Sequence, residues 1–153
     1  MIARRLALAT LAAAGALALV GCGAMGSSSS SSSSAGGMSG ATMNIPLSGR
    51  NQVPPNTSPG TGTGRVDLDG NVIKWTVTYS GLTGPVTAGH FHGPAAPGAN
   101  AGVVLPFTGS LASPITGTAT LTPAQLADVK AGLWYINLHT AAHPGGEVRG
   151  QVR

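Results

Sequence analysis

The sequence predicts an all-β fold, an antiparallel Greek-key sandwich or flattened barrel of about eight strands with one short helix. Two observations lead to this prediction. The 153 residues include 24 Gly and 11 Pro, whereas only 8% are charged and 4% aromatic, which suits many turns and excludes a coiled coil or a long helical bundle. From residue 43 onward, short runs of alternating apolar and polar residues are separated by Gly, Pro and Asn clusters, as in strands joined by turns.

The strands are expected where this alternation is strongest. The clearest is Val72–Ser80, in which Ile73, Trp75, Val77 and Tyr79 share one face because side chains alternate along a strand. Further strands are expected at Trp134–His139 and Glu147–Arg153, and weaker ones at Met43–Leu47, Gly64–Leu68, Thr87–His92, Val103–Phe107 and Thr116–Leu121.

One helix is expected over residues 122–131. Thr122 can cap its N-terminus, Pro123 occupies the first helical position, and Gln125 completes a capping box. Gly132 follows the last helical residue and is expected to end the helix.

The first 21 residues have the pattern of a secretory signal peptide. Two arginines lie within Met1–Arg5, and Leu6–Val20 is uncharged, too short a run to span a bilayer comfortably. It leads into Leu19-Val20-Gly21-Cys22, which resembles the bacterial lipobox and holds the only cysteine. The resemblance implies that Cys22 is lipidated and anchors the chain to a membrane. The alternative is an ordinary secreted protein whose cysteine is removed or left free.

The residue after the cysteine bears on localisation. Gly23, rather than Asp, follows Cys22, and the sorting rule for Gram-negative lipoproteins then implies the outer membrane, on its periplasmic or external side. In a cell with a single membrane, the protein would lie on the outer face of that membrane. We therefore expect a cell-envelope protein.

A tether is expected between the anchor and the domain. Residues 22–42 are rich in Gly and Ser, with eight consecutive serines at Ser27–Ser34. Such a segment behaves as a flexible coil spanning about 25 Å. The folded domain is expected to occupy residues 43–153.

The charge of the chain does not indicate nucleic-acid binding, although its pI is about 10.0. Arg4 and Arg5 belong to the signal segment, which leaves the domain six basic residues against four acidic ones. The basic residues are scattered, with neither a basic stripe nor an aromatic platform between them. We therefore exclude nucleic acid as a partner.

Histidines form the best candidate for a metal site. His90 and His92 are two apart on an expected strand and therefore project from one face, while His139 lies near the end of another strand. If the strands converge, His90, His92 and His139 form a three-imidazole site with an open position, suited to Zn or Cu. The alternative is that these histidines are solvated or merely hydrogen-bonded.

Four further residues are candidates for supporting the metal ligands or binding a partner: Asn137, His143, Glu147 and Arg149. Asn137 shares the face of His139, and His143 lies in the turn before Glu147. Glu147 could orient one imidazole ring from behind. The default interpretation of Glu147 and Arg149 is a surface ion pair along one strand face.

No catalytic set is evident. No serine lies in a strand–turn–helix elbow, and the four acidic residues show no pairing suited to glycoside hydrolysis. Asp67-Leu68-Asp69-Gly70-Asn71 lacks the rest of a calcium-binding loop and is better explained as a turn between strands.

Four ordered motifs together resemble the CHRD domain, the domain named for its repeats in chordin. They are Leu47-Ser48-Gly49-Arg50-Asn51-Gln52-Val53-Pro54-Pro55, Gly89-His90-Phe91-His92-Gly93-Pro94-Ala95, Trp134-Tyr135-Ile136-Asn137-Leu138-His139-Thr140 and Gly145-Gly146-Glu147-Val148-Arg149-Gly150-Gln151. The resemblance covers Met43–Arg153 as a single copy. It implies an extracellular domain, and no enzymatic activity comes with the family name. The growth-factor partners of animal relatives do not transfer to a bacterial protein.

A weaker resemblance connects the HxH strand, the later histidine and the C-terminal arginine to Cu,Zn superoxide dismutase. The zinc-loop ligands and the disulfide cysteines of that enzyme have no counterparts in this sequence.

Three hypotheses follow. The leading one is a non-enzymatic, lipid-anchored binding module, with Cu or Zn at the histidines. The second is a redox metalloenzyme, and the third is a metal-free scaffold that binds an envelope protein. In the leading hypothesis, the binding face carries His90, His92, Asn137, His139, Glu147 and Arg149. In the third, the histidines, Glu147 and Arg149 only satisfy one another's hydrogen bonds.

Overall fold

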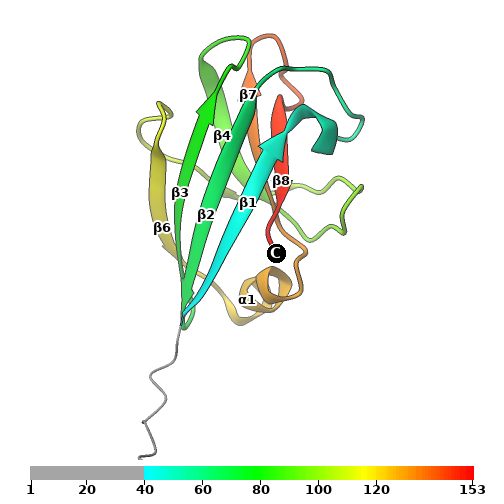
Figure 1. The fold of residues 1–153 in the computed structure, drawn as a ribbon. Helices are drawn as coiled ribbons and strands as arrows, with labels where there is room; N and C mark the ends of the chain where they lie inside the picture. The colour runs from blue at the N-terminus through cyan, green and yellow to red at the C-terminus, as the bar shows by residue number, and fades with distance from the viewer. Residues whose placement is uncertain (1–39) are drawn as a thin grey trace, which may run out of the picture. The chain divides into compact units, whose positions relative to one another are not determined.

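The computed structural model describes residues 40–153, an eight-stranded antiparallel sheet with one α-helix (Figure 1). The predicted signal peptide, Cys22 and nearly all of the predicted tether lie outside the described residues. The strands are β1 (Ala41–Ser48), β2 (Thr61–Asp69), β3 (Val72–Ser80), β4 (Val86–His92), β5 (Val103–Pro106), β6 (Ile115–Thr120), β7 (Tyr135–Thr140) and β8 (Val148–Gln151). A short 3-10 helix, η1 (Gly49–Asn51), follows β1. The predicted all-β class is confirmed, and a strand occupies each expected place.

The eight strands form one continuous sheet in the order β5-β4-β7-β8-β1-β2-β3-β6. The sheet curls, so that β4 and β7 lie behind β1–β3 in Figure 1. It remains open, because β5 and β6 are the two edges and do not pair with each other. Of the two expected arrangements, a sandwich and a flattened barrel, the flattened barrel is nearer to this single curled sheet.

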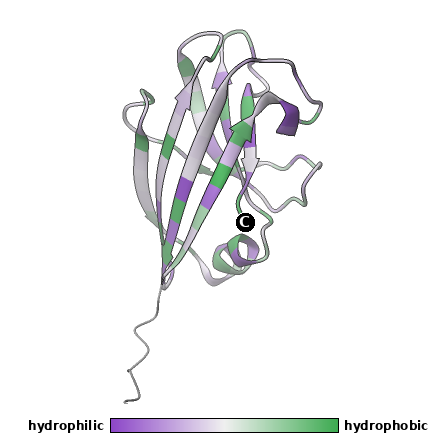
Figure 2. Ribbon diagram, in the orientation of Figure 1, coloured by the Kyte–Doolittle hydropathy of each residue, from purple (hydrophilic) through white to green (hydrophobic). Residues whose placement is uncertain are grey.

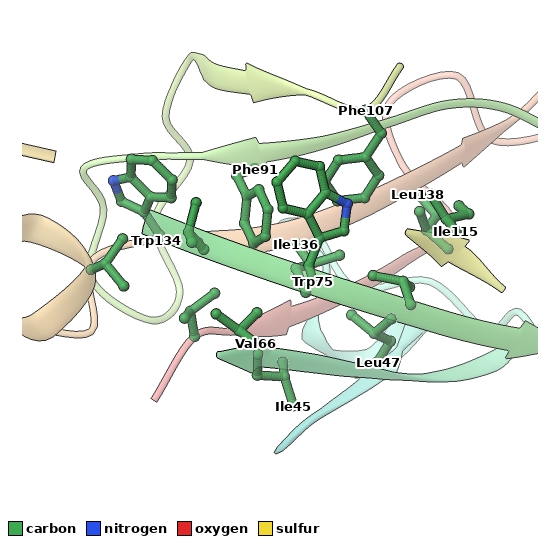
Figure 3. Packing of buried hydrophobic residues seen from close by; sticks show 14 of the residues in the cluster. Ile45, Leu47, Val66, Trp75, Phe91, Phe107, Ile115, Trp134, Ile136 and Leu138 are labelled. Carbon is green, nitrogen blue, oxygen red and sulfur yellow. The ribbon is translucent and has the colours of Figure 1, made fainter. Parts of the chain in front are cut away.

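Buried residues alternate with more exposed ones along β2 and β3, and Figure 2 shows hydropathy changing from residue to residue along these strands. The core residues shown in Figure 3 come from most of the strands. Trp75 of β3 lies at its centre. Its ring stacks on Phe107 and meets Phe91 edge-on, each at a centroid distance of 5.4 Å. The aromatic core therefore joins β3 to β4 across the curl.

The helix α1 (Pro123–Lys130) begins as the sequence predicted. The Thr122 hydroxyl accepts a hydrogen bond from the Gln125 N–H, and the Gln125 side chain accepts one from the Thr122 N–H. Gly132, with φ of +70°, follows the helix in the left-handed conformation that glycine adopts easily. Within residues 40–153, no helix is long and apolar enough to cross a membrane.

Candidate metal centre

Strands β4 and β7 bring the three predicted ligands together. The two strands are antiparallel neighbours, with His92 paired to Tyr135, His90 to Asn137 and Ala88 to His139. His90, His92 and His139 therefore lie on one face, opposite the core face that carries Phe91 and Ile136. One nitrogen from each imidazole lies within 4.8 Å of the other two. We call these three residues the histidine cluster.

The spacing inside the cluster suits a small metal ion. Nδ1 of His90 lies 3.3 Å from Nε2 of His139. Two imidazole nitrogens bound to one tetrahedral zinc at about 2.0–2.1 Å are separated by about 3.3–3.4 Å. The cluster thus matches the separation that one shared ion requires for this pair of rings.

Backbone carbonyls hold two of the rings from behind. Nδ1 of His92 lies 3.0 Å from the Ala101 carbonyl, and Nδ1 of His139 lies 2.9 Å from that of Pro144. A carbonyl can only accept, so Nδ1 of His92 and Nδ1 of His139 each carry a proton. Nε2 of His92 and Nε2 of His139 then face away from these carbonyls, in the arrangement typical of metal-bound histidine. Nε2 of His92 has no hydrogen-bond partner, whereas Nε2 of His139 is within hydrogen-bond distance of Nδ1 of His90.

His92 is the most constrained member of the cluster. It is only 9% exposed, and its Nε2 is buried without a hydrogen-bond partner. Burial also lowers the pKa of His92, despite the opposing hydrogen bond to Ala101, and burial together with the charge of His139 lowers the pKa of His90. Both rings are therefore mainly neutral at pH 7, and each has one ring nitrogen that carries a lone pair.

Tyr135 supports the cluster, although the sequence did not single it out. Its ring stacks on His92 at 4.9 Å with an interplanar angle of 3°. Its hydroxyl bonds both the N–H and the carbonyl of Ala101, the carbonyl that also holds His92. On the other side, Cζ of Arg149 lies 3.5 Å from the Tyr135 ring centroid. The sequence signal that could have identified Tyr135 is its position on the same strand face as Asn137 and His139.

The other predicted residues, Asn137 and His143, form no hydrogen bond with the imidazoles in the described part of the chain. Asn137 accepts a hydrogen bond from Gln52 and donates one to the Gly145 carbonyl. The hydrogen bonds of His143 in the described part of the chain involve its backbone. Neither residue bonds a histidine ring, so the predicted supporting role passes to the carbonyls of Ala101 and Pro144.

Glu147 does not form the predicted surface ion pair with Arg149. Residues 40–153 contain one ion pair, between Arg65 and Asp67. Glu147 precedes β8, is 0% exposed, and accepts four hydrogen bonds, from the Ser58 hydroxyl, the Thr83 N–H and hydroxyl, and the Thr140 hydroxyl. Nor does Glu147 orient an imidazole, because its four donors are hydroxyl groups and a backbone N–H, and none is a histidine ring.

The four donors determine the charge state of Glu147. Burial alone would raise the pKa of the carboxyl, but hydrogen bonds from Ser58, Thr140 and Thr83 outweigh burial and lower it to about 2. The carboxylate is thus ionised at neutral pH without a cation beside it. It ties the segment before β2 and the β3–β4 connection to the turn before β8.

Comparison with known families now identifies the domain. The family model described as the CHRD domain matches residues 43–152. The chain belongs to the CHRD family. The match covers nearly all of the described residues and confirms the resemblance of the four sequence motifs. Membership supports an extracellular-type binding module. No curated protein and no solved structure matches the chain.

Proposed function

We propose that this CHRD protein is a membrane-anchored extracytoplasmic binding module that holds one Zn²⁺ or Cu²⁺ ion in the histidine cluster. The observation that carries the proposal is the buried, unpartnered Nε2 of His92 beside the imidazoles of His90 and His139. A buried polar atom without a partner costs free energy. A metal ion would satisfy His92 Nε2 and bind the neighbouring lone pairs at the same time.

The ligand types favour a metal ion of intermediate softness, such as Zn²⁺ or Cu²⁺. Imidazole suits Zn and Cu, whereas Ca²⁺ and Mg²⁺ take oxygen ligands. The cluster contains only imidazoles, and Cu²⁺ is expected to bind more tightly than Zn²⁺ at such a site. Three protein ligands leave one position open for water or a partner's side chain.

The first prediction is that the chain binds Zn²⁺ and Cu²⁺. Calorimetric titration of the full chain, purified in detergent, with each ion tests it. Every sample carries Cys22→Ser, which removes the chain's one thiol. We expect one ion per chain. Replacing His92 by alanine removes a ligand, so we expect the affinity to fall by more than about 100-fold, beyond the usual effect of losing a supporting residue.

His143→Ala is the matched control, because it also replaces one histidine of the domain by alanine, but a histidine that lies outside the cluster. The control is expected to bind as tightly as the chain that carries Cys22→Ser alone. Absence of binding, or binding that His92→Ala retains, would contradict the metal proposal. A metal-free interaction module would then explain the domain better.

The second prediction concerns the anchor, which the lipobox-like sequence around Cys22 supports. Lipidation at this cysteine would fix the domain to the membrane, since each buried methylene contributes about 0.8 kcal/mol. We expect the chain to incorporate labelled palmitate in bacterial cells and Cys22→Ser to incorporate none and accumulate as an unprocessed precursor. Unchanged labelling or processing in this variant would contradict the anchor.

A further inference from the structure

A groove of about 650 Å³ lies against β1, η1 and β8, and no residue of the histidine cluster lines it. Arg50, Arg149 and Arg153 contribute to its lining, and no acidic residue does. We call it the arginine groove. The volume falls within the range of small-molecule sites. The groove therefore has a size and a charge that the proposed metal site does not explain.

No acidic side chain in residues 40–153 pairs with the arginines of the groove. The one ion pair within residues 40–153 joins Arg65 and Asp67, which do not line the groove. Glu147, two residues before Arg149, directs its carboxylate to hydroxyl groups and an N–H instead. An anion entering the groove would meet arginines that have no carboxylate bound to them.

Arg149 forms the fixed part of the groove. It is 2% exposed, and its guanidinium lies over Tyr135, donating from Nη1 to Oδ1 of Asn100 and from Nη2 to the Ala99 carbonyl. These acceptors are neutral, so the burial cost of the charge is not offset by an anion. Burial accordingly lowers the pKa of Arg149. Because the side chain is already held in place, an incoming anion would lose little free energy in ordering it.

The remaining walls indicate what the anion carries. Pro46, Val53 and Pro97 line the groove beside the arginines. Apolar walls favour an organic body over a bare inorganic ion, while the planar guanidinium matches a carboxylate in a bidentate fashion. We propose that the arginine groove binds a small organic carboxylate, with the carboxylate among Arg50, Arg149 and Arg153 and the body against the prolines.

The test titrates the full chain with benzoate, acetate and inorganic phosphate at constant ionic strength, followed by NMR shifts of the backbone amides. We expect saturable binding of benzoate, at least 10-fold tighter than that of acetate, with shifts at residues 50, 149 and 153. Phosphate binding as tightly as benzoate would overturn the carboxylate assignment. Absence of saturable benzoate binding would overturn the site itself.

Variants separate the groove from general positive charge. Arg50→Gln with Arg153→Gln changes two exposed side chains, so the fold is expected to survive, and benzoate binding should weaken at least 10-fold. Arg65→Gln, which changes an exposed residue of β2 outside the groove, is the control and should change binding less than twofold. Equal weakening by Arg65→Gln would show that the attraction is nonspecific and would overturn the proposal.

Discussion

Replacing Glu147 by alanine is expected to lower the free energy of unfolding by about 3–5 kcal/mol, because several hydrogen-bond donors lose their acceptor at a cost of about 1–3 kcal/mol for each one that stays buried. The variant leaves three hydroxyls and the Thr83 N–H without their common acceptor. Since small domains are stable by only about 5–15 kcal/mol, urea denaturation should show a large fall in the midpoint. A loss below about 1 kcal/mol would contradict the role assigned to this carboxylate.

The same carboxylate makes stability depend on pH. Its pKa is about 2 in the folded chain, below the ordinary 4.5, so its contribution is complete above about pH 4.5 and declines as pH falls toward 2. Glu147→Gln keeps the shape but loses the charge, and its stability should vary less between pH 5 and 2. Equal acid sensitivity of Glu147→Gln and the unsubstituted chain would assign the effect to other groups.

The second large effect is expected at Gly117. This residue of β6 pairs directly with Trp75 of β3, and a Cβ added to it would overlap Cζ2, Cε2 and Cη2 of the indole. Trp75 cannot retreat freely, because Phe91 and Phe107 pack against it. We expect Gly117→Val to cost about 3 kcal/mol through overpacking, measured as a lower midpoint in urea.

The mechanism can be isolated by a double-mutant cycle. Trp75→Leu removes the indole, so adding Gly117→Val to it should cost much less than in the unsubstituted chain. Gly145→Ala is the control, since an added Cβ there meets no atom within 4 Å. If the cost of Gly117→Val were the same with and without the indole, overpacking would not be its cause.

Much of the fold could be predicted because period-2 alternation reports directly on which side chains face a sheet's interior. Val72–Ser80 was predicted with the bounds that the structure gives, and Thr122 and Gln125 specified the start of the helix. The histidine cluster was predictable for the same reason, since the HxH spacing places both rings on one face. Its third member required β7 to lie beside β4, which the sequence left as a condition.

The surroundings of Tyr135 and Glu147 could not be predicted in this way. Alternation placed Tyr135 on the polar face of its strand, yet it is buried, because Ala101 and neighbouring loop residues cover that face. Glu147 is satisfied by Ser58 and Thr83, which are 89 and 64 residues away in sequence. Contacts of this range depend on loop paths that local periodicity does not encode.

The open sheet has a consequence for how these molecules behave when crowded together. An unpaired edge strand can recruit a strand from another chain and begin aggregation. Edge strand β5 has four residues and ends in Pro106, which has no N–H to donate. Val103 on this edge is half exposed and would not by itself prevent pairing with another chain. The protection of β5 therefore comes from its short length and from the proline. Molecules concentrated on one surface are therefore expected to resist edge-to-edge polymerisation through β5.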